Sequence, residues 1–397
     1  MASKANPAIV AVAFNRPLSI SRLLDSLTNA DYQATSVPLV ISVDFSDSDN
    51  GEQVRKIAES FVWPFGEKEL IFHDRNLGLR KHILSCGDLT EKYGSVIVFE
   101  DDLSVSPCFH NYASAALDFT ADQSNVAGVS LYHYRTHFLK RLPFIPLYDG
   151  HENYYLQNPS SVGQAWSREQ WNGFRSWYDT KLKVDASLNE KLPDNLPIHP
   201  RVANWPESSW LKFFIWYMVE QQKYFLFPRV SYSTNHHDVG THALGATPAW
   251  QVPLTMKHSD FRFSKFQDSL AVYDSYFEIE VSRLKSMSPL LRDFEFDVDL
   301  FGIKPAAAIS KPLILTSRQA TKQAKLLFDL ERKPFEANFQ TTSSSENASC
   351  FSLVEPQFLT SESNLSLSKR RTFEYFYGPV SLKNMAKNLM KYYFQKD

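Results

Sequence analysis

The segment from Ser95 to Asp102 reads Ser-Val-Ile-Val-Phe-Glu-Asp-Asp and says more about the fold than any other stretch of the chain. The apolar run after the serine is typical of a strand that is covered on both faces of a parallel sheet. Three carboxylates follow it directly. In open α/β sheets ligands bind at the carboxyl ends of the strands. The segment therefore predicts a central strand with a functional site at its end.

The segments around this strand alternate between short apolar runs and helical patterns. The runs that we expect to form other strands are Ile9–Phe14, Leu39–Val43, Glu69–His73 and Val126–Tyr132. Between them, apolar residues recur three and four positions apart, as on one face of a helix. Such alternation predicts an α/β fold with a doubly wound, mostly parallel sheet.

The pattern loosens after the fifth expected strand. We predict helices over Arg168–Tyr178 and Pro206–Gln222 and a strand over Phe225–Val230. The loop His133–His137, with Lys140 and Arg141, could bind an acidic acceptor, but we expect it to be solvated.

The last third of the chain has a different character, with charged-helical patterns and Ser/Thr-rich segments. We predict a first domain over residues 1–250 and a helical or irregular extension over residues 251–397. Near the end, Ser381–Phe394 has an apolar face beside a basic row. Such a helix either contacts a membrane surface peripherally or docks on the core with its lysines in water.

The composition excludes several classes of protein. Lys and Arg number 42 and Asp and Glu number 44, so the net charge of -2 excludes a globally basic nucleic-acid-binding protein. The longest apolar runs fall far short of the roughly 20 residues that cross a bilayer. The first seven residues do not resemble a secretory signal, and the three cysteines lie far apart. We therefore expect a cytoplasmic protein, free or at the inner face of the membrane.

The acidic triplet Glu100-Asp101-Asp102 is the first candidate for chemistry. Adjacent carboxylates repel one another unless a cation lies among them, and oxygen ligands favour Mg²⁺ or Mn²⁺. Such ions usually keep positions for substrate phosphates. The alternative is a solvated acidic turn in which Asp102 caps a helix near Pro107.

Two further residues follow expected strands. Asp44 ends the second strand, where a carboxylate could accept a hydrogen bond from a nucleobase or a ribose hydroxyl; we expect the nearby Asp49 to be a helix cap. Arg16 comes between the first strand and the helix that starts at Pro17, which is an arrangement that suits an anion. Together with Asp102 these residues match a nucleoside diphosphate and its metal.

The same region resembles a known family. The segments Val10–Pro17, His73–Leu79 and Tyr93–Leu103 resemble the GT-A glycosyltransferases. They are similar to bacterial family 2-like glycosyltransferases and to metal-dependent N-acetylglucosaminyltransferases, in which Glu-Asp-Asp is a variant of the Asp-X-Asp motif. The resemblance covers roughly Ala8–Gly245 and is strongest up to Tyr132.

The resemblance implies a role for each residue of the triplet and its neighbours. Asp102 would hold Mn²⁺ or Mg²⁺ and, through it, the diphosphate of the donor. Asp101 would lie near the ribose or the donor sugar. Arg16 would meet the phosphates, and Asp44 would meet the base.

The resemblance also implies a catalytic base beside Trp210. Family members carry an Asp at the start of a helix next to Trp, and Asn204–Trp210 is the matching segment. The expected Asp is absent, and Glu207 is the nearest carboxylate, although the match could place Ser208 there instead. As an alternative, Glu207 would only interact favourably with the dipole of a helix that begins after Pro206.

Two more elements follow from the resemblance. The Gly-Thr-His element that ends at His242 would lie near the diphosphate and the metal. His236 and His237 suggest zinc, but adjacent residues of a strand face opposite ways, which disfavours that reading. Gly163 and Trp166 match a position that lines the donor sugar and the acceptor; Trp166 is otherwise a core aromatic residue.

We therefore expect a metal-dependent, inverting hexosyl- or N-acetylhexosaminyltransferase. It would move a sugar from a nucleotide-diphosphate donor, a UDP-sugar, to a glycan or lipid-linked acceptor in surface polysaccharide synthesis. One alternative is a sugar-nucleotidyltransferase, which the glycine-free segment Phe14–Pro17 disfavours. The other is a non-catalytic glycan- or nucleotide-binding protein with a decayed site, which the missing Asp near Trp210 favours.

Overall fold

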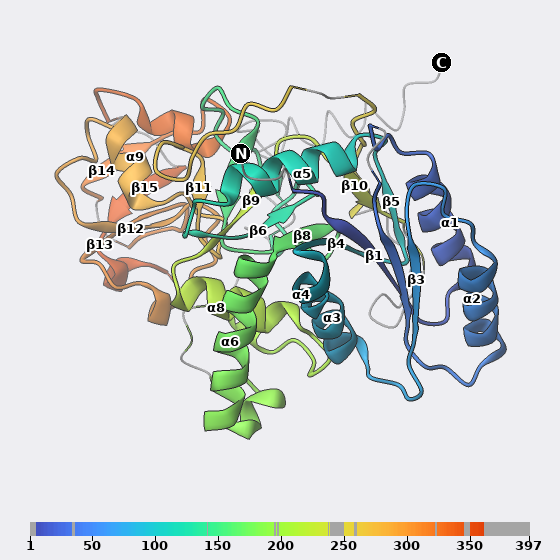
Figure 1. Cartoon of the computed structure of the whole chain (residues 1–397). Helices are drawn as coiled ribbons and strands as arrows, with labels where there is room; N and C mark the ends of the chain where they lie inside the picture. Colours follow the sequence, from blue (N-terminus) through green and yellow to red (C-terminus); the bar gives the residue numbers. More distant parts are fainter. Residues whose placement is uncertain are drawn as a thin grey trace, which may run out of the picture.

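The structure is a computed structural model. It describes residues 5–33, 36–140, 142–193, 196, 198–236, 238, 250–257, 260–321, 324–344 and 350–360. Within these residues, nine strands form one sheet in the order β11-β7-β9-β6-β8-β4-β1-β2-β3 (Figure 1).

Most strands of this sheet run in one direction. The strands are β1 (Ala8–Ala13), β2 (Leu39–Val43), β3 (Lys68–Phe72), β4 (Ser95–Glu100), β6 (Val126–Ser130), β7 (Asn153–Leu156), β8 (Gln164–Ser167), β9 (Tyr224–Pro228) and β11 (Val272–Tyr273). β3, β2, β1 and β4 are mutually parallel, and β6 and β9 share their direction. β8 is antiparallel to both β4 and β6, between which it lies. The mostly parallel sheet predicted from the sequence is confirmed.

Helices cover both faces of the sheet, so the doubly wound arrangement is also confirmed. One face, the α1 face, carries α1 (Pro17–Thr28), α2 (Asp49–Ser60) and α5 (Phe109–Thr120). The other, the α3 face, carries α3 (Leu79–Asp88), α4 (Thr90–Tyr93), α6 (Arg168–Val184), α7 (Pro200–Ala203) and α8 (Leu211–Glu220). Figure 1 shows α5 on one side of the strands and α6 and α8 on the other.

The central strand explains the two cores. In β4, Val96 and Val98 point into the core of the α3 face, and Ile97 and Phe99 point into the core of the α1 face. All four side chains are at most 1% exposed. This double burial is what the continuous apolar run predicts.

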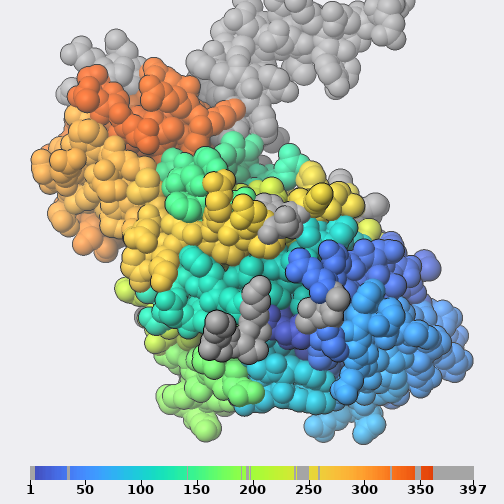
Figure 2. All heavy atoms as spheres, turned by 45° about the horizontal axis from the view of Figure 1, so that its top comes forward, coloured from blue at the N-terminus to red at the C-terminus, as the bar shows by residue number. Residues whose placement is uncertain are grey.

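The chain beyond residue 250 contains strands that the predicted helical or irregular extension did not include. β11 joins the edge of the main sheet by pairing with β7, so the main sheet extends past residue 250. After α9 (Val281–Met287), a second sheet forms from β12 (Phe296–Asp299), β13 (Leu313–Thr316), β15 (Phe351–Val354) and β14 (Leu326–Phe328), in that order. Figure 2 shows this orange region beside the blue-to-green main body. The predicted helical or irregular extension did not include this second sheet.

Several local expectations are also corrected. α8 begins at Leu211 rather than after Pro206. The cap of α2 is Ser48 rather than Asp49, because the Ser48 side chain accepts a hydrogen bond from Gly51 N. His137, which was expected in a solvated loop, is completely buried.

The basic amphipathic helix that the sequence predicts over residues 381–394 lies outside the described residues. Among the helices that the structure does describe, none combines the length and the apolar character that crossing a membrane requires.

Candidate functional site

The carboxyl ends of β1, β2 and β4 bring predicted site residues to one edge of the sheet. Arg16 follows β1, Asp44 follows β2, and Asp101 and Asp102 follow β4. Because β1 pairs in parallel with both β2 and β4, these three ends are neighbours. We refer to this side of the sheet as the carboxyl edge.

Arg16 joins the two aspartates. Its guanidinium forms an ion pair with Asp101, and its Nη1 lies 3.2 Å from Asp102 Oδ2. The Arg16 backbone caps α1, and its carbonyl accepts a hydrogen bond from Ile20 N. Burial alone would lower the pKa of Arg16, but the charges of Asp101 and Asp102 raise it overall.

The carboxylates of this cluster are incompletely satisfied. Asp101 is 3% exposed, and within the described residues its Oδ2 has no hydrogen-bond partner. Burial raises the pKa of Asp101 to about 6, against the lowering effect of Arg16. The Asp102 side chain is 20% exposed. Asp102 is followed by β5 (Leu103–Val105), so it does not cap a helix.

Asp101 and Asp102 suit a hard cation that also binds phosphate and water better than a metal ion held by protein side chains alone. In the part of the chain that the structure describes, no group of three or more His, Cys, Asp or Glu side chains forms a metal-binding cluster. Mg²⁺ and Mn²⁺ do not need one, because they commonly take one or two carboxylates and complete their shell with phosphate oxygens and water. An unpartnered buried oxygen beside an accessible carboxylate meets that requirement.

Glu100 is the last residue of β4 and shares the α3 face with Val98, because side chains alternate along a strand. Asp101 and Asp102 lie in the turn that follows the strand. Burial, and then the charges of Asp102 and Asp101, raise the pKa of Glu100 to about 8. Near neutral pH this carboxyl group is therefore mostly protonated and able to donate a hydrogen bond.

Asp44 has a structural task that sequence reasoning missed. Its Oδ1 accepts a hydrogen bond from Leu77 N at 2.8 Å, and its Oδ2 accepts one from Gly78 N at 3.0 Å. Gly78 has a φ of 74°, a conformation that glycine adopts readily. Asp44 thus anchors the turn that leads into α3. Its contact with a nucleobase stays a prediction.

A late segment reaches the acidic triplet through a small ladder. β10 (Ser233–Asn235) pairs antiparallel with β5, directly after the triplet. The next residue, His236, donates its backbone N–H to Asp102 O at 2.8 Å. The segment that the sequence places near the metal therefore begins beside Asp102. His237 and His242 lie outside the described residues.

Asp238 connects this segment to α1. It forms an ion pair with Arg22, and its Oδ2 accepts a hydrogen bond from Ser19 Oγ at 2.9 Å. Ser19 and Arg22 belong to the first two turns of the helix that Arg16 caps. No sequence pattern indicated this contact, because it joins residues more than 200 positions apart.

Glu207 lies in a turn before α8, so the alternative of a helix-dipole contact in the first turn is wrong. Its side chain is 62% exposed, and its Oε1 lies 3.2 Å from Nη2 of Arg80, whose side chain is 7% exposed. Arg80 belongs to the first turn of α3 and lies over the Phe213 ring of α8. Glu207 is thus held where α3 and α8 begin, and its role as a base stays a prediction.

Trp166 is completely buried. It packs against Trp171, Trp210 and Phe214 on the α3 face, which is the packing of a core aromatic residue. Its role in lining a ligand stays untested. Gly163, in the turn before β8, has a φ of 84°, and a Cβ there would lie 2.7 Å from Ser233 Oγ. The glycine is therefore required by the close approach of the turn to β10.

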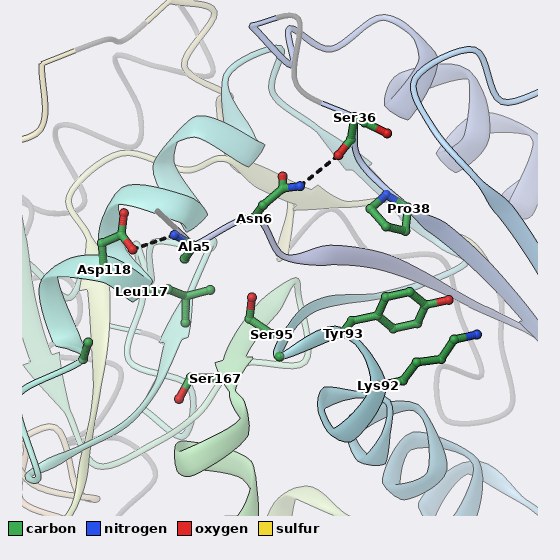
Figure 3. Close-up of a pocket in the computed structure, with 12 residues that line it drawn as sticks. Ala5, Asn6, Ser36, Pro38, Lys92, Tyr93, Ser95, Leu117, Asp118 and Ser167 are labelled. Atoms are coloured by element: carbon green, nitrogen blue, oxygen red, sulfur yellow. Dashed lines mark hydrogen bonds between the residues drawn. The ribbon is translucent and has the colours of Figure 1, made fainter. Parts of the chain in front are cut away.

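A separate cavity of about 570 Å³ lies at the opposite edge of the sheet (Figure 3). Its lining includes Asn6 and Pro38, which precede β1 and β2, together with Ser95 at the start of β4. Figure 3 shows Asn6 donating to Ser36 across this hollow, a contact of 2.8 Å to the backbone carbonyl. None of the predicted site residues lines it.

Comparison with solved structures finds distant likenesses. No protein-family model and no curated protein matches the sequence. It is similar in structure to S. aureus TarS 1-349, with a TM-score of 0.35 and 12% identity over 57% of this chain and 59% of that one. It is also similar to the mannosyltransferase PcManGT from Pyrobaculum calidifontis in complex with GDP-Man and Mn2+, with a TM-score of 0.30 and 16% identity over 42% and 46% of the two chains.

A third solved structure shows the same level of likeness. GalNAc-T7 with UDP, GalNAc and Mn2+ matches with a TM-score of 0.37 and 14% identity over 57% of this chain and 43% of that one. The match therefore spans less than two thirds of each of these three proteins. Likenesses this distant do not assign a family or an activity, so a function has to be argued from the residues.

Proposed function

We propose that this protein is a metal-dependent glycosyltransferase of the GT-A type that uses a nucleotide-diphosphate sugar. The observation that carries this proposal is the cluster of Arg16, Asp101 and Asp102 at the carboxyl end of a central strand, with one buried oxygen left unpartnered. A cation and acids at this edge suit a diphosphate and its metal. The resemblance of the acidic triplet to the Glu-Asp-Asp motif points to the same chemistry.

Each residue of the cluster has a role in this proposal. Asp102, which is the more accessible acid, would hold Mn²⁺ or Mg²⁺; when bound, the ion supplies charge stabilisation for the departing diphosphate. Asp101 would hold the ribose or the sugar. Arg16 would exchange part of its contact with the aspartates for the phosphates, and Asp44 would receive the base. His242 would approach the diphosphate.

The chemical step needs a base for the acceptor. The acceptor hydroxyl oxygen forms a bond to the anomeric carbon while the bond from that carbon to the diphosphate oxygen breaks. The hydroxyl proton passes to a carboxylate, for which we propose Glu207, and the nucleoside diphosphate leaves. The buried Arg80, 3.2 Å from Glu207, would hold that carboxylate in place before the reaction. In-line attack of this kind inverts the anomeric centre.

The wider context is part of the same proposal. We favour a UDP-sugar as donor and a glycan or lipid-linked acceptor in surface polysaccharide synthesis, at a cytoplasmic location. The basic helix over residues 381–394 would provide a peripheral membrane contact.

Nucleotide release tests this function directly. The purified protein is incubated with UDP-, GDP-, CMP- and dTDP-sugars and Mn²⁺, with and without a chelator. We expect chelator-sensitive release of one nucleotide. In Asp102→Ala the rate should fall more than about 100-fold, because a metal ligand contributes several kcal/mol to stabilising the transition state. Asp25→Ala, which removes an exposed acid from α1, serves as the matched control.

The outcomes separate the alternatives. Binding of a nucleotide sugar without release, even with candidate acceptors, would favour a non-catalytic binding protein with an inactive base at Glu207. Absence of both binding and release across the panel would reject the proposed function.

A further inference from the structure

The side chain of Lys212, the second residue of α8, is completely buried. Its Nζ donates a hydrogen bond to the backbone carbonyl of Trp205 at 3.0 Å. Among the described residues, no carboxylate forms an ion pair with this ammonium group. Lysine is almost never fully buried unless its charge is paired. The burial of Lys212 therefore needs a reason other than the packing of the core.

The carbonyl that Lys212 contacts belongs to the turn that carries Glu207. This turn, residues 204–210, connects α7 to α8. Trp205 is half-buried, and Glu207, two residues further on, is 62% exposed. An exposed carboxylate on a short turn stays in one place only if the backbone beneath it is held. Lys212 supplies that support from inside the protein.

A second buried cation holds the carboxylate end of the same glutamate. Arg80 of α3 lies 3.2 Å from Glu207, and its side chain is 7% exposed. Both cations lie against one aromatic ring, since Arg80 Cζ is 5.2 Å and Lys212 Nζ is 5.5 Å from the centre of the Phe213 ring. Burial and then the charge of Arg80 lower the pKa of Lys212, whereas the charge of Glu207 acts in the opposite direction. The three charged groups are therefore neighbours at the start of α8.

Keeping two cations near each other in a poorly solvated place costs stability. An apolar residue in place of Lys212 would avoid that cost. What the lysine adds is a second point of attachment. Arg80 fixes the carboxylate at the end of the Glu207 side chain, and Lys212 fixes the backbone from which that side chain starts. Two fixed points leave the carboxylate less freedom than one.

The position of a catalytic base matters because it has to lie within hydrogen-bond distance of the proton that it removes. A displacement of about 1 Å can lower a rate by about 100-fold. We infer that Lys212 is a positioning residue, which holds the Trp205 carbonyl so that Glu207 meets the acceptor hydroxyl group. The inference rests on the proposed function and adds to it a residue that does not touch the substrate. The competing account is that Lys212 stabilises the start of α8 and has no influence on Glu207.

A double-mutant cycle separates these accounts. Lys212→Met keeps the length of the side chain and removes its charge and its donors. We expect the rate of nucleotide release at saturating donor and acceptor to fall about 10- to 100-fold in this variant, with less than about a twofold change in calorimetric affinity for the sugar nucleotide in the presence of Mn²⁺. In Glu207→Gln, which has already lost the base, the same substitution should change the residual rate by less than about twofold. Lys183→Met, which changes an exposed lysine of α6, is the control.

Hydrogen exchange adds a readout that does not depend on turnover. In Lys212→Met the amides of residues 204–210 should exchange faster than in wild type, while those of β4 exchange at the same rate. The Tm should change little, because an apolar side chain replaces a buried cation.

The outcomes separate the inference from the function on which it rests. An equal loss of rate in the wild-type and Glu207→Gln backgrounds, a parallel loss of donor affinity, or a large fall in Tm would show a structural role for Lys212 and overturn the inference. Unchanged release or unchanged exchange in Lys212→Met would overturn it as well and leave the transferase proposal standing. A wild-type rate in Glu207→Gln would remove Glu207 as the base, and the inference with it. If wild type releases no nucleotide from any sugar of the panel, even with candidate acceptors, the proposed function itself fails.

Discussion

Two groups of buried carboxylates in this molecule meet cations, and they differ in how fully their oxygens are paired. In the C-terminal region, Asp299 Oδ1 accepts hydrogen bonds from Ile303 N and Lys304 N, and Oδ2 lies 2.8 Å from Arg318 Nε. At the carboxyl edge, one oxygen of Asp101 meets a guanidinium and the other has no partner within the described residues. Asp299 is 0% exposed and Asp101 is 3% exposed.

The difference teaches how to separate structural acids from functional ones in this chain. Both aspartates are buried, and burial raises the pKa of each. Asp299 joins β12 to the loop after it and to Arg318, two residues after β13, so its pairing holds the second sheet together. Asp101 pairs only with Arg16, at the edge of the candidate site. Burial alone does not distinguish them, whereas an unpartnered oxygen does.

The largest expected effect tests this contrast by exchanging each aspartate for asparagine. Asp299→Asn leaves the Arg318 charge buried without its counter-ion, so we expect the free energy of unfolding to fall by about 3–5 kcal/mol. Asp101→Asn leaves Arg16 paired with Asp102, so its free energy of unfolding should change by less than about 1 kcal/mol while nucleotide release is lost. Urea unfolding followed by circular dichroism measures the free energy of unfolding of both variants, and the release assay measures the activity of Asp101→Asn.

Asp293→Asn, which changes an exposed acid shortly before β12, provides the control for this pair. Equal destabilisation by Asp101→Asn and Asp299→Asn would remove the distinction between the two clusters.

A second prediction concerns how the stability of the C-terminal region depends on pH. Glu336 is buried beside Tyr273 of β11, with 5% of its surface exposed, and burial raises its pKa from 4.5 to about 7. The folded state therefore binds more protons than the unfolded state between these values. Stability from this group is present below about pH 4.5 and is lost as the pH rises through 7, by an expected 1–3 kcal/mol or so.

Glu336→Gln keeps a neutral side chain at every pH and should remove this contribution. We expect the variant to gain on wild type as the pH is raised from 5 to 8, which urea midpoints at several pH values would measure. A constant difference between the two proteins across this range would contradict the assigned pKa.

The fold of the first 130 residues could be predicted because each strand carries its own signal. The run in β4 is apolar on both faces, and Ile20, Leu23 and Leu24 mark one face of α1. Beyond residue 250 the strands are short, and their partners are distant in the sequence. β13 pairs with β12 on one side and with β15 on the other, so no local pattern specifies the second sheet.

The candidate site divides in the same way. Arg16, Asp44 and Asp102 were found because residues that directly follow parallel strands must meet at one edge. Asp238 was missed, because its position depends on a contact with α1 that joins residues more than 200 positions apart. No local spacing in the sequence indicates such a contact.

The smallest expected effect concerns that last contact. The ion pair between Asp238 and Arg22 is partly solvated, with side chains 26% and 39% exposed, so it should contribute less than about 1 kcal/mol to global stability. Its position matters more than its strength, because it fixes the segment after β10 against the helix that Arg16 caps. Asp238→Asn should therefore leave Tm unchanged and weaken the binding of the sugar nucleotide about two- to fivefold. Salt should weaken binding to wild type more than binding to the variant, since only wild type has an ion pair to screen at this position. Equal affinities and equal salt dependence in calorimetric titrations would place Asp238 outside the site and leave the carboxyl edge to the residues that follow β1, β2 and β4.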